Sequence, residues 1–522
     1  MPQLKQPVSL ECIVLQSVQN FILDLGQQLI DEECSGVPAT TLPVRWGVPS
    51  YLQQPVKKKV FTNPKIHKLR PFLHPDLPLH LSNAVTTSAL KAISILVSTT
   101  KCTNDAFSKT GDDNCRDIIE NLITNALHLK ISHLDLLSWP WFMGEVLLKH
   151  LKEFHNLQML KLWPGSWSPV WATVVSMLES DSCRMKNLVS FSMRCHCTDK
   201  VLQVLGNSVQ LQHLDVMSSI EVTDGCVGSL IKLKKLKVIN MVSTSLSADG
   251  YSRLLTDIPQ LSKLMWFDSS GQALKNVSTT PLGLHSYEAS HVTVTQLNIL
   301  VHKCPYLTQI SLHWVQTDLS VLKELVYLRD IKLANCSALN SNLRQLLQVR
   351  GYNITSLELH EVTEVDLVMI GIFCTNLRKM NLVCNFQQHA EQYCIGMDIP
   401  LFKHLEELMY GSLYSEYLFF NCINIKKMEL SKCTNFTDNT VMTLLGKNPL
   451  KQLEVLTIIN CGFISLNSVH MLLDSCDNLR VLEGLDTWGG VNKLQFAELC
   501  LEMKKKNLNI EILWKKPLHI KW

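Results

Sequence analysis

The sequence has 522 residues, of which 46% are apolar and 18% are charged, and its formal net charge is +3. This length allows three or four globular domains or one long repetitive domain. The near-neutral charge argues against nucleic acid or an anionic membrane as the main partner. No run approaches the roughly 20 uninterrupted apolar residues that a membrane span needs, and polar residues interrupt any signal-peptide core. We therefore expect a soluble protein of the cytoplasm, the nucleus or both.

Residues 1–75 contain an apolar stripe with the spacing of an amphipathic helix. Its members are Leu10, Val14, Leu15, Val18, Ile22, Leu25 and Leu29. A polar, turn-rich stretch follows over residues 32–41, and Leu42-Pro43 begins a second segment. We expect an N-terminal helical region that either binds an adaptor or caps the fold.

Two short motifs in this region resemble the boxes of VHL-box receptors of cullin-RING ubiquitin ligases. The stretch from Ser9 to Val18 is similar to the elongin-binding box, with Val14 where the family has cysteine. Val48-Pro49 followed by Leu52 resembles the cullin-selecting box. The resemblance implies an elongin-type adaptor and a cullin as partners. It places the adaptor-binding residues at Leu10, Val14, Leu15, Val18, Val48, Pro49 and Leu52.

Two other interpretations of this region remain open. The helix is also suited to cap the first coil of a repetitive fold, since an uncapped end coil exposes its core. Alternatively, Leu42-Pro43 begins a divergent F-box that binds a Skp-type adaptor. Trp46, Gly47 and Pro49 count against the F-box, because they interrupt the continuous helix that it needs.

Residues 76–130 are expected to form degenerate repeats and an exposed loop. Leu90–Val97 is apolar and predicts a helix, whereas residues 98–114 are mostly polar.

A repeat organises residues 131–522. Apolar residues recur at positions 1, 4 and 6 of each unit, with 15 starts between residues 131 and 479, about 25 residues apart. The clearest copy runs from Met428 to Asp438 and contains Cys433. This pattern resembles the cysteine-containing subtype of leucine-rich repeats. The resemblance implies an α/β solenoid shaped as a horseshoe, with a parallel concave sheet, convex helices and a C-terminal cap.

In such a repeat, the residues that alternate with the buried leucines face the concave side of the sheet. We expect this face to bind a protein, through a polar central stripe and an apolar C-terminal third. The polar members are His213, Asp215, Lys263, His313, Lys332, Glu358, His360 and Lys379. The apolar members are Val455, Ile459, Val481 and Leu485, which we expect to contact either a partner or the chain's own tail, residues 513–522.

No catalytic motif is present, and the 18 cysteines are scattered rather than grouped as metal ligands. We expect no enzyme activity, no metal and no cofactor. The sequence favours a protein-interaction protein, above all the substrate-recognition subunit of a cullin-RING ubiquitin ligase. The alternatives are a stand-alone leucine-rich-repeat scaffold without a ligase and a divergent F-box receptor.

Overall fold

The computed structural model falls into two compact units, residues 8–246 and 247–522. The described residues are 9–34, 64–67, 69–73, 78–99, 113–128, 130–136, 139–162, 169–180, 186–266, 270–315, 317–336, 340–362, 365–383, 401–411 and 416–515. Val48, Pro49 and Leu52 lie outside these ranges. Each unit is described by itself.

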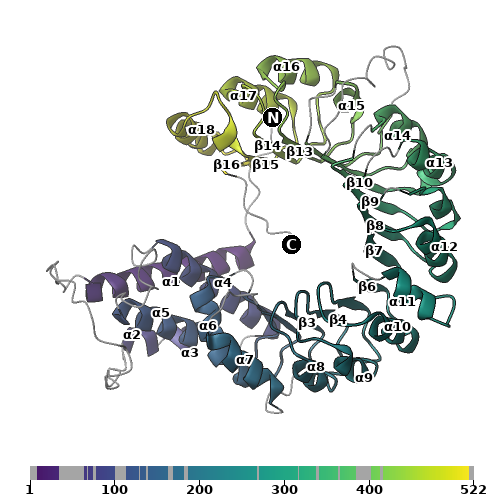
Figure 1. The fold of residues 1–522 in the computed structure, drawn as a ribbon. Coiled ribbons are helices and arrows are strands. Elements are labelled where there is room, and N and C mark those ends of the chain that lie inside the picture. The colour runs from purple at the N-terminus through teal and green to yellow at the C-terminus, as the bar shows by residue number, and fades with distance from the viewer. Residues whose placement is uncertain are drawn as a thin grey trace, which may run out of the picture. The chain divides into compact units, whose positions relative to one another are not determined.

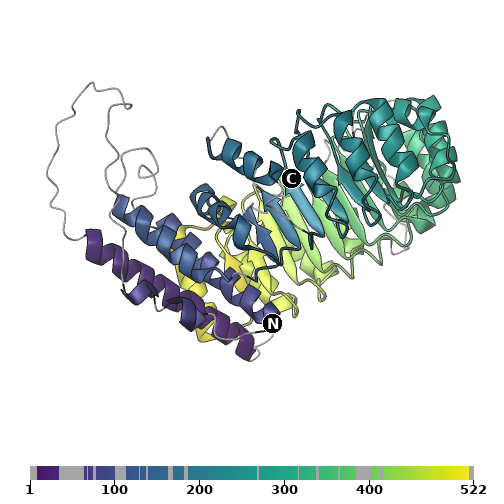
Figure 2. The same cartoon turned by 90° about the horizontal axis from the view of Figure 1, so that it is seen from below.

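The unit of residues 8–246 begins with helices that pack on one another (Figures 1 and 2). They are α1 (Leu10–Cys34), α2 (Pro64–His67), α3 (Leu69–Leu73), α4 (Leu79–Thr99) and α5 (Asp113–Ala126). The helix expected from the apolar stripe is therefore present as α1. Its buried residues pack on α4 and α5, which brings three apolar stripes together into one core.

Residues 76–130 differ from the expectation of degenerate repeats. Their described part forms α4 and α5 and contains no strand. Residues 80–99 of α4 are long and apolar enough to cross a membrane by length and composition, but 56% of that stretch is buried inside the unit. A helix that is apolar on most sides is typical of a buried core position. Asn83 joins α4 to the first coil, since its Nδ2 lies 2.7 Å from Ser132 Oγ.

Coils of strand and helix complete this unit. The strands are β1 (His133–Asp135), β2 (Met159–Leu162), β3 (Ser190–Met193), β4 (His213–Asp215) and β5 (Val238–Asn240), parallel and in chain order. The helices between them are α6 (Trp141–Lys149), α7 (Pro169–Glu179), α8 (Asp199–Leu205) and α9 (Val227–Leu230).

The unit of residues 247–522 continues the same alternation, with its strands on the inner side of the arc and its helices on the outer side (Figure 1). The strands are β6 (Lys263–Met265), β7 (Ser286–Ser290), β8 (Gln309–His313), β9 (Asp330–Ala334), β10 (Ser356–His360), β11 (Lys379–Val383), β12 (Glu407–Tyr410), β13 (Lys427–Ser431), β14 (Val455–Ile459), β15 (Val481–Glu483) and β16 (Glu511–Leu513). The helices are α10 (Ala248–Asp257), α11 (Ser270–Asn276), α12 (Val294–Lys303), α13 (Asn340–Arg350), α14 (Leu367–Phe373), α15 (Glu416–Asn421), α16 (Asp438–Lys447), α17 (Leu466–Ser475) and α18 (Lys493–Lys505).

The register of the strands follows the repeat found in the sequence. Leu357 of β10 pairs with Ile331 of β9 on one side and with Met380 of β11 on the other. All three occupy position 4 of their units, and each is at most 2% exposed. A buried residue aligns with a buried residue because a slip of one would turn every leucine to the other face. The prediction of an α/β leucine-rich-repeat solenoid is confirmed.

The cysteines and the Thr-Asp pairs of the repeat have structural roles in the turns. The thiol of Cys336 donates to the carbonyl of Ala334 at 3.2 Å, two residues back. Thr437 caps α16, since its hydroxyl accepts from the backbone N–H of Thr440. Asp438 Oδ1 accepts from the backbone N–H of Ser465 at 2.9 Å and so links two coils. These side chains satisfy buried backbone and hydroxyl groups of the solenoid.

Candidate functional site

The N-terminal half of α1 carries the box positions and exposes apolar side chains. Ile13 is 49% exposed and Val14 is 48% exposed. Leu15 and Val18 are half-buried, and Leu10 is the first residue of the helix. Because residues four and seven apart share a helix face, positions 10, 14 and 21 lie on one side of α1. The structure thus brings the expected box positions of α1 together on a helix that begins at the box.

The C-terminal half of α1 is packed instead. Ile22 and Leu29 are fully buried, and Leu25 is 9% exposed. Gly26 allows a close approach, since a Cβ at this position would clash with the side chain of Leu96 in α4 and touch Leu122 of α5. The first turns of α1 therefore extend an apolar face from a helix whose remainder is fixed in a core.

Two phenylalanines that the sequence did not single out enlarge the exposed face. Phe21 of α1 is 42% exposed, Phe72 of α3 is 61% exposed, and their ring centroids lie 5.0 Å apart. Contiguous exposed apolar side chains of this kind are uncommon on an isolated protein surface and are typical of docking sites. We call Ile13, Val14, Phe21 and Phe72 the α1 docking face.

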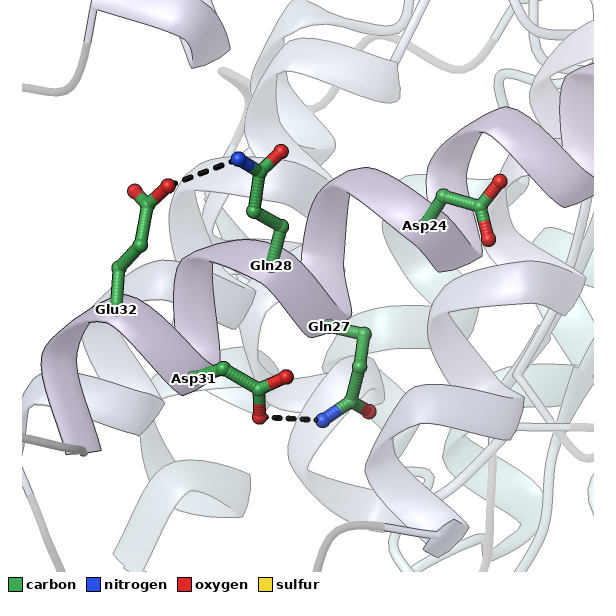
Figure 3. Close-up of a pocket in the computed structure, with 5 residues that line it drawn as sticks. All are labelled: Asp24, Gln27, Gln28, Asp31 and Glu32. Atoms are coloured by element: carbon green, nitrogen blue, oxygen red, sulfur yellow. Dashed lines mark hydrogen bonds between the residues drawn. The ribbon is translucent and has the colours of Figure 1, made fainter.

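A shallow depression of about 600 Å³ follows on the exposed side of the same helix (Figure 3). It is lined by Asp24, Gln27, Gln28, Asp31 and Glu32. Gln27 Nε2 donates to Asp31 Oδ1 at 2.8 Å, and Gln28 Nε2 donates to Glu32 Oε1 at 2.9 Å. Lys65 forms an ion pair with Glu32 at 2.9 Å and holds the pKa of that carboxyl below its ordinary value. The depression is thus an acidic surface that Lys65 partly neutralises.

The sheet of residues 247–522 joins four of the expected concave residues into one charged cluster. Glu358 Oε1 lies 2.9 Å from Lys379 Nζ, and Glu358 Oε2 lies 3.9 Å from Lys332 Nζ and 3.8 Å from His360 Nε2. His360 and Lys379 lower the pKa of Glu358 to about 2. We assign the stronger hold to Lys379, because 3.8 Å is too long for a hydrogen bond from His360. The cluster therefore combines one negative side chain, Glu358, with two positive side chains, Lys332 and Lys379.

Other expected polar residues have partners that the sequence did not indicate. His313 Nε2 of β8 lies 3.5 Å from Glu288 Oε1 of β7. Lys263 lies on β6 and is half-buried. In the unit of residues 8–246, His213 is exposed on β4, and Asp215 accepts from Arg194 Nη2 at 2.7 Å. These pairs join neighbouring coils and are visible only once the strand register is known.

A pair of polar side chains lies among the apolar residues expected on the inner face of β14 and β15. Val455 and Ile459 of β14 and Val481 of β15 are half-buried, on the side opposite the core. Between them, Thr457 Oγ1 donates to Glu483 Oε2 at 2.9 Å, and both side chains are buried. We expected an apolar surface here, and this pair adds a buried polar contact between its apolar residues.

The expectation for Leu485 is wrong, since this residue is fully buried. Gly484 adopts a φ of 90°, which turns the chain inward immediately after β15. A Cβ at Gly484 would clash with the backbone carbonyl of Ile458, so this turn requires glycine. Leu513 of the expected tail belongs to β16, and residues 516–522 lie outside the described residues.

Three buried thiols of the solenoid are poor nucleophiles. Burial raises the pKa of Cys304, Cys374 and Cys476 to about 12, so these thiols stay protonated at neutral pH. Across the described ranges no group of three or more histidine, cysteine, aspartate or glutamate side chains is arranged to hold a metal ion. What the described residues do offer is surface for binding.

Comparison with known proteins adds no family. No family model matches the chain, and no curated protein matches it. Among solved structures, the chain is similar to an internalin from Listeria monocytogenes, at 12% identity over 69% of this chain and 81% of that chain, with a TM-score of 0.32. It is also similar to the complex of Rad7 and Elc1 in yeast, at 12% identity over 65% of this chain and 87% of that chain, with a TM-score of 0.37. Values this low identify neither a partner nor an activity, so the function has to be argued from this chain's own residues.

Proposed function

We propose that this chain is a non-catalytic substrate receptor of a cullin-RING ubiquitin ligase. The α1 docking face binds an elongin-type adaptor, and the inner face of the sheet holds a protein substrate. The receptor then acts by raising the effective concentration of substrate lysines beside the ubiquitin donor.

The observation that carries this proposal is the division of α1 into two halves. A helix that served only as a cap would bury its apolar stripe along its whole length. Here Ile22 and Leu29 are fully buried, whereas Val14 of the same stripe is 48% exposed and Leu15 and Val18 are half-buried. The exposed half is also the half that resembles the elongin-binding box.

A stand-alone scaffold is the second candidate, and the packing of α1, α4 and α5 favours it. These helices share one core, and Asn83 of α4 bonds to Ser132 at the start of the first coil. On this interpretation the bundle only covers the end of the solenoid, and no ligase component binds α1.

Co-purification of the full chain with adaptors separates the two candidates. Val14→Asp places a charge on the α1 docking face, so we expect recovery of an elongin-type adaptor to fall at least tenfold. We expect Leu10→Ser to reduce the recovery in the same way. Gln16→Asp is the matched control, because it adds the same charge to the same helix on the side away from Val14 and Phe21, with Ile13 as its only neighbour among the docking-face residues of α1.

Circular dichroism shows whether each variant keeps the fold, which an exposed substitution is expected to preserve. Equal recovery with the wild type, Val14→Asp and Gln16→Asp would refute the docking face. Recovery of a Skp-type adaptor in place of the elongin type would favour the F-box alternative instead.

A further inference from the structure

An asparagine column links successive coils at the edge of the sheet where the strands begin. In several coils the residue directly before the first buried apolar residue is asparagine, and its amide donates to a backbone carbonyl of the preceding coil. These bonds are Asn353 to Val326 (3.4 Å), Asn376 to Tyr352 (2.8 Å), Asn424 to Lys403 (2.7 Å) and Asn478 to Lys451 (2.9 Å). The column therefore has a structural role that explains its residue type.

Two consecutive coils place tyrosine in this column. Tyr306 precedes β8 and is 42% exposed, and Tyr327 precedes β9 and is 51% exposed. Their ring centroids lie 6.2 Å apart. One residue earlier in their coils, Val326 is 47% exposed and Tyr352 is 53% exposed. We call these four residues the tyrosine edge.

The tyrosine edge is contiguous because neighbouring strands lie only about 4.8 Å apart. At these two positions the chain has exposed rings, where four other coils of this unit have an asparagine whose amide bonds to the preceding coil. Such a departure from the structural residue, in adjacent coils, is not explained by packing of the solenoid. Exposed tyrosines that gather in one place are typical of a binding surface.

Basic residues outnumber acidic ones around the tyrosine edge. Between residues 303 and 352, the basic residues are Lys303, Lys323, Arg329, Lys332, Arg344 and Arg350. Arg350 is held in place, since its Nε donates to the carbonyl of Lys323 at 2.6 Å. The acidic residues of this stretch are Asp318, Glu324 and Asp330, and Asp330 Oδ2 already accepts from Gln309 on the inner face. The occupant that complements this charge is acidic.

We propose that the tyrosine edge binds a segment of a partner protein that combines an apolar side chain with acidic residues. The apolar side chain packs between the rings of Tyr306 and Tyr327, and the acidic residues meet Arg329 and Arg350. Tyrosine and arginine are the residue types that most often dominate the energy of protein interfaces. This inference is independent of adaptor binding, since it rests on another unit of the chain.

A random peptide library displayed on phage and selected on the full-length protein tests this inference. The double variant Tyr306→Asn/Tyr327→Asn serves for counter-selection, because asparagine is the residue that other coils place here. We expect the enriched peptides to be acidic and to contain an apolar residue. Enrichment of basic peptides, or of none that depends on the tyrosines, would overturn the proposal.

Affinity measurements on one enriched peptide complete the test. By fluorescence anisotropy we expect binding to weaken at least tenfold in the double variant and in Arg329→Glu, and to weaken with added salt. Phe463→Asn is the matched control, since Phe463 is 83% exposed on a distant coil, and we expect less than a twofold change. Arg329→Glu keeps both rings, so it decides the question if the double variant does not fold. Undiminished binding in Arg329→Glu and in a folded double variant contradicts the proposal.

Discussion

Replacing Glu358 with glutamine removes the carboxylate that holds the inner face of the solenoid together electrostatically. This carboxylate lies 2.9 Å from Lys379 Nζ and 3.9 Å from Lys332 Nζ, and its pKa is about 2 instead of the ordinary 4.5. At 1.36 kcal/mol per pKa unit, the difference of about 2.5 units corresponds to at most about 3.4 kcal/mol. Both lysine side chains are more than 40% exposed, so solvent screens the interaction. We expect Glu358→Gln to lower the free energy of unfolding by about 1–2 kcal/mol at pH 7.

The effect of Glu358→Gln on the free energy of unfolding is expected to shrink as the pH falls. Because the pKa of Glu358 is lowered in the folded state, its contribution is complete above about pH 4.5 and is lost as the pH falls through about 2. Urea unfolding followed by circular dichroism measures the difference between wild type and Glu358→Gln, which should fall by more than half between pH 7 and pH 3. Glu407→Gln is the control, since its partner Lys427 is 3.4 Å away and both side chains are largely exposed, so we expect less than about 0.5 kcal/mol. A Glu358→Gln effect below about 0.3 kcal/mol, or one equal at both pH values, would refute the reasoning.

Two further substitutions test the packing that positions the binding surfaces. Gly26→Val forces a side chain against Leu96 of α4, so we expect a loss of about 1–3 kcal/mol and faster proteolysis of α1. Gly144→Ala, where nothing lies within 4 Å of the added methyl, should be neutral or slightly stabilising in the same assay. Asn448→Ala removes the hydrogen-bond donor of the buried carbonyls of Phe419 and Cys422, which lie 2.9 and 3.1 Å from Asn448 Nδ2. We expect the free energy of unfolding in urea to fall by about 2–3 kcal/mol. An equal loss in the exposed Asn424→Ala would show that burial is not the cause.

The sequence predicted most of the solenoid because its signal is a repeated burial pattern. The phase of the leucines implied which residues pair, as Leu357 with Met380, since burial sets the register. Strand β16 was not predicted, because Asn509 and Trp514 stand where the repeat calls for leucine. Leu485 was misplaced because the turn at Gly484 depends on a backbone angle that the pattern does not record.

The candidate sites were less predictable because their residues meet across coils or helices. Glu288 becomes a partner of His313 only through the β7–β8 register. Phe72 lies 51 residues after Phe21 in the sequence, and only the packing of α1 and α3 brings the two rings to 5.0 Å. The tyrosine edge is visible in the sequence as Tyr306 and Tyr327. Its role as a binding surface is suggested only by comparison with the hydrogen bonds that asparagine side chains form at the same position in other coils.

Hydrogen exchange of α1, with and without an elongin-type adaptor, tests the central claim most directly. We expect the adaptor to slow exchange in residues 10–21, which carry the exposed apolar positions, and to leave α5, residues 113–126, unchanged. Val14→Asp should abolish this protection, whereas Gln16→Asp should preserve it. Exchange in residues 10–21 that is the same with and without saturating adaptor would contradict the account, and α1 would then be only a cap of the solenoid.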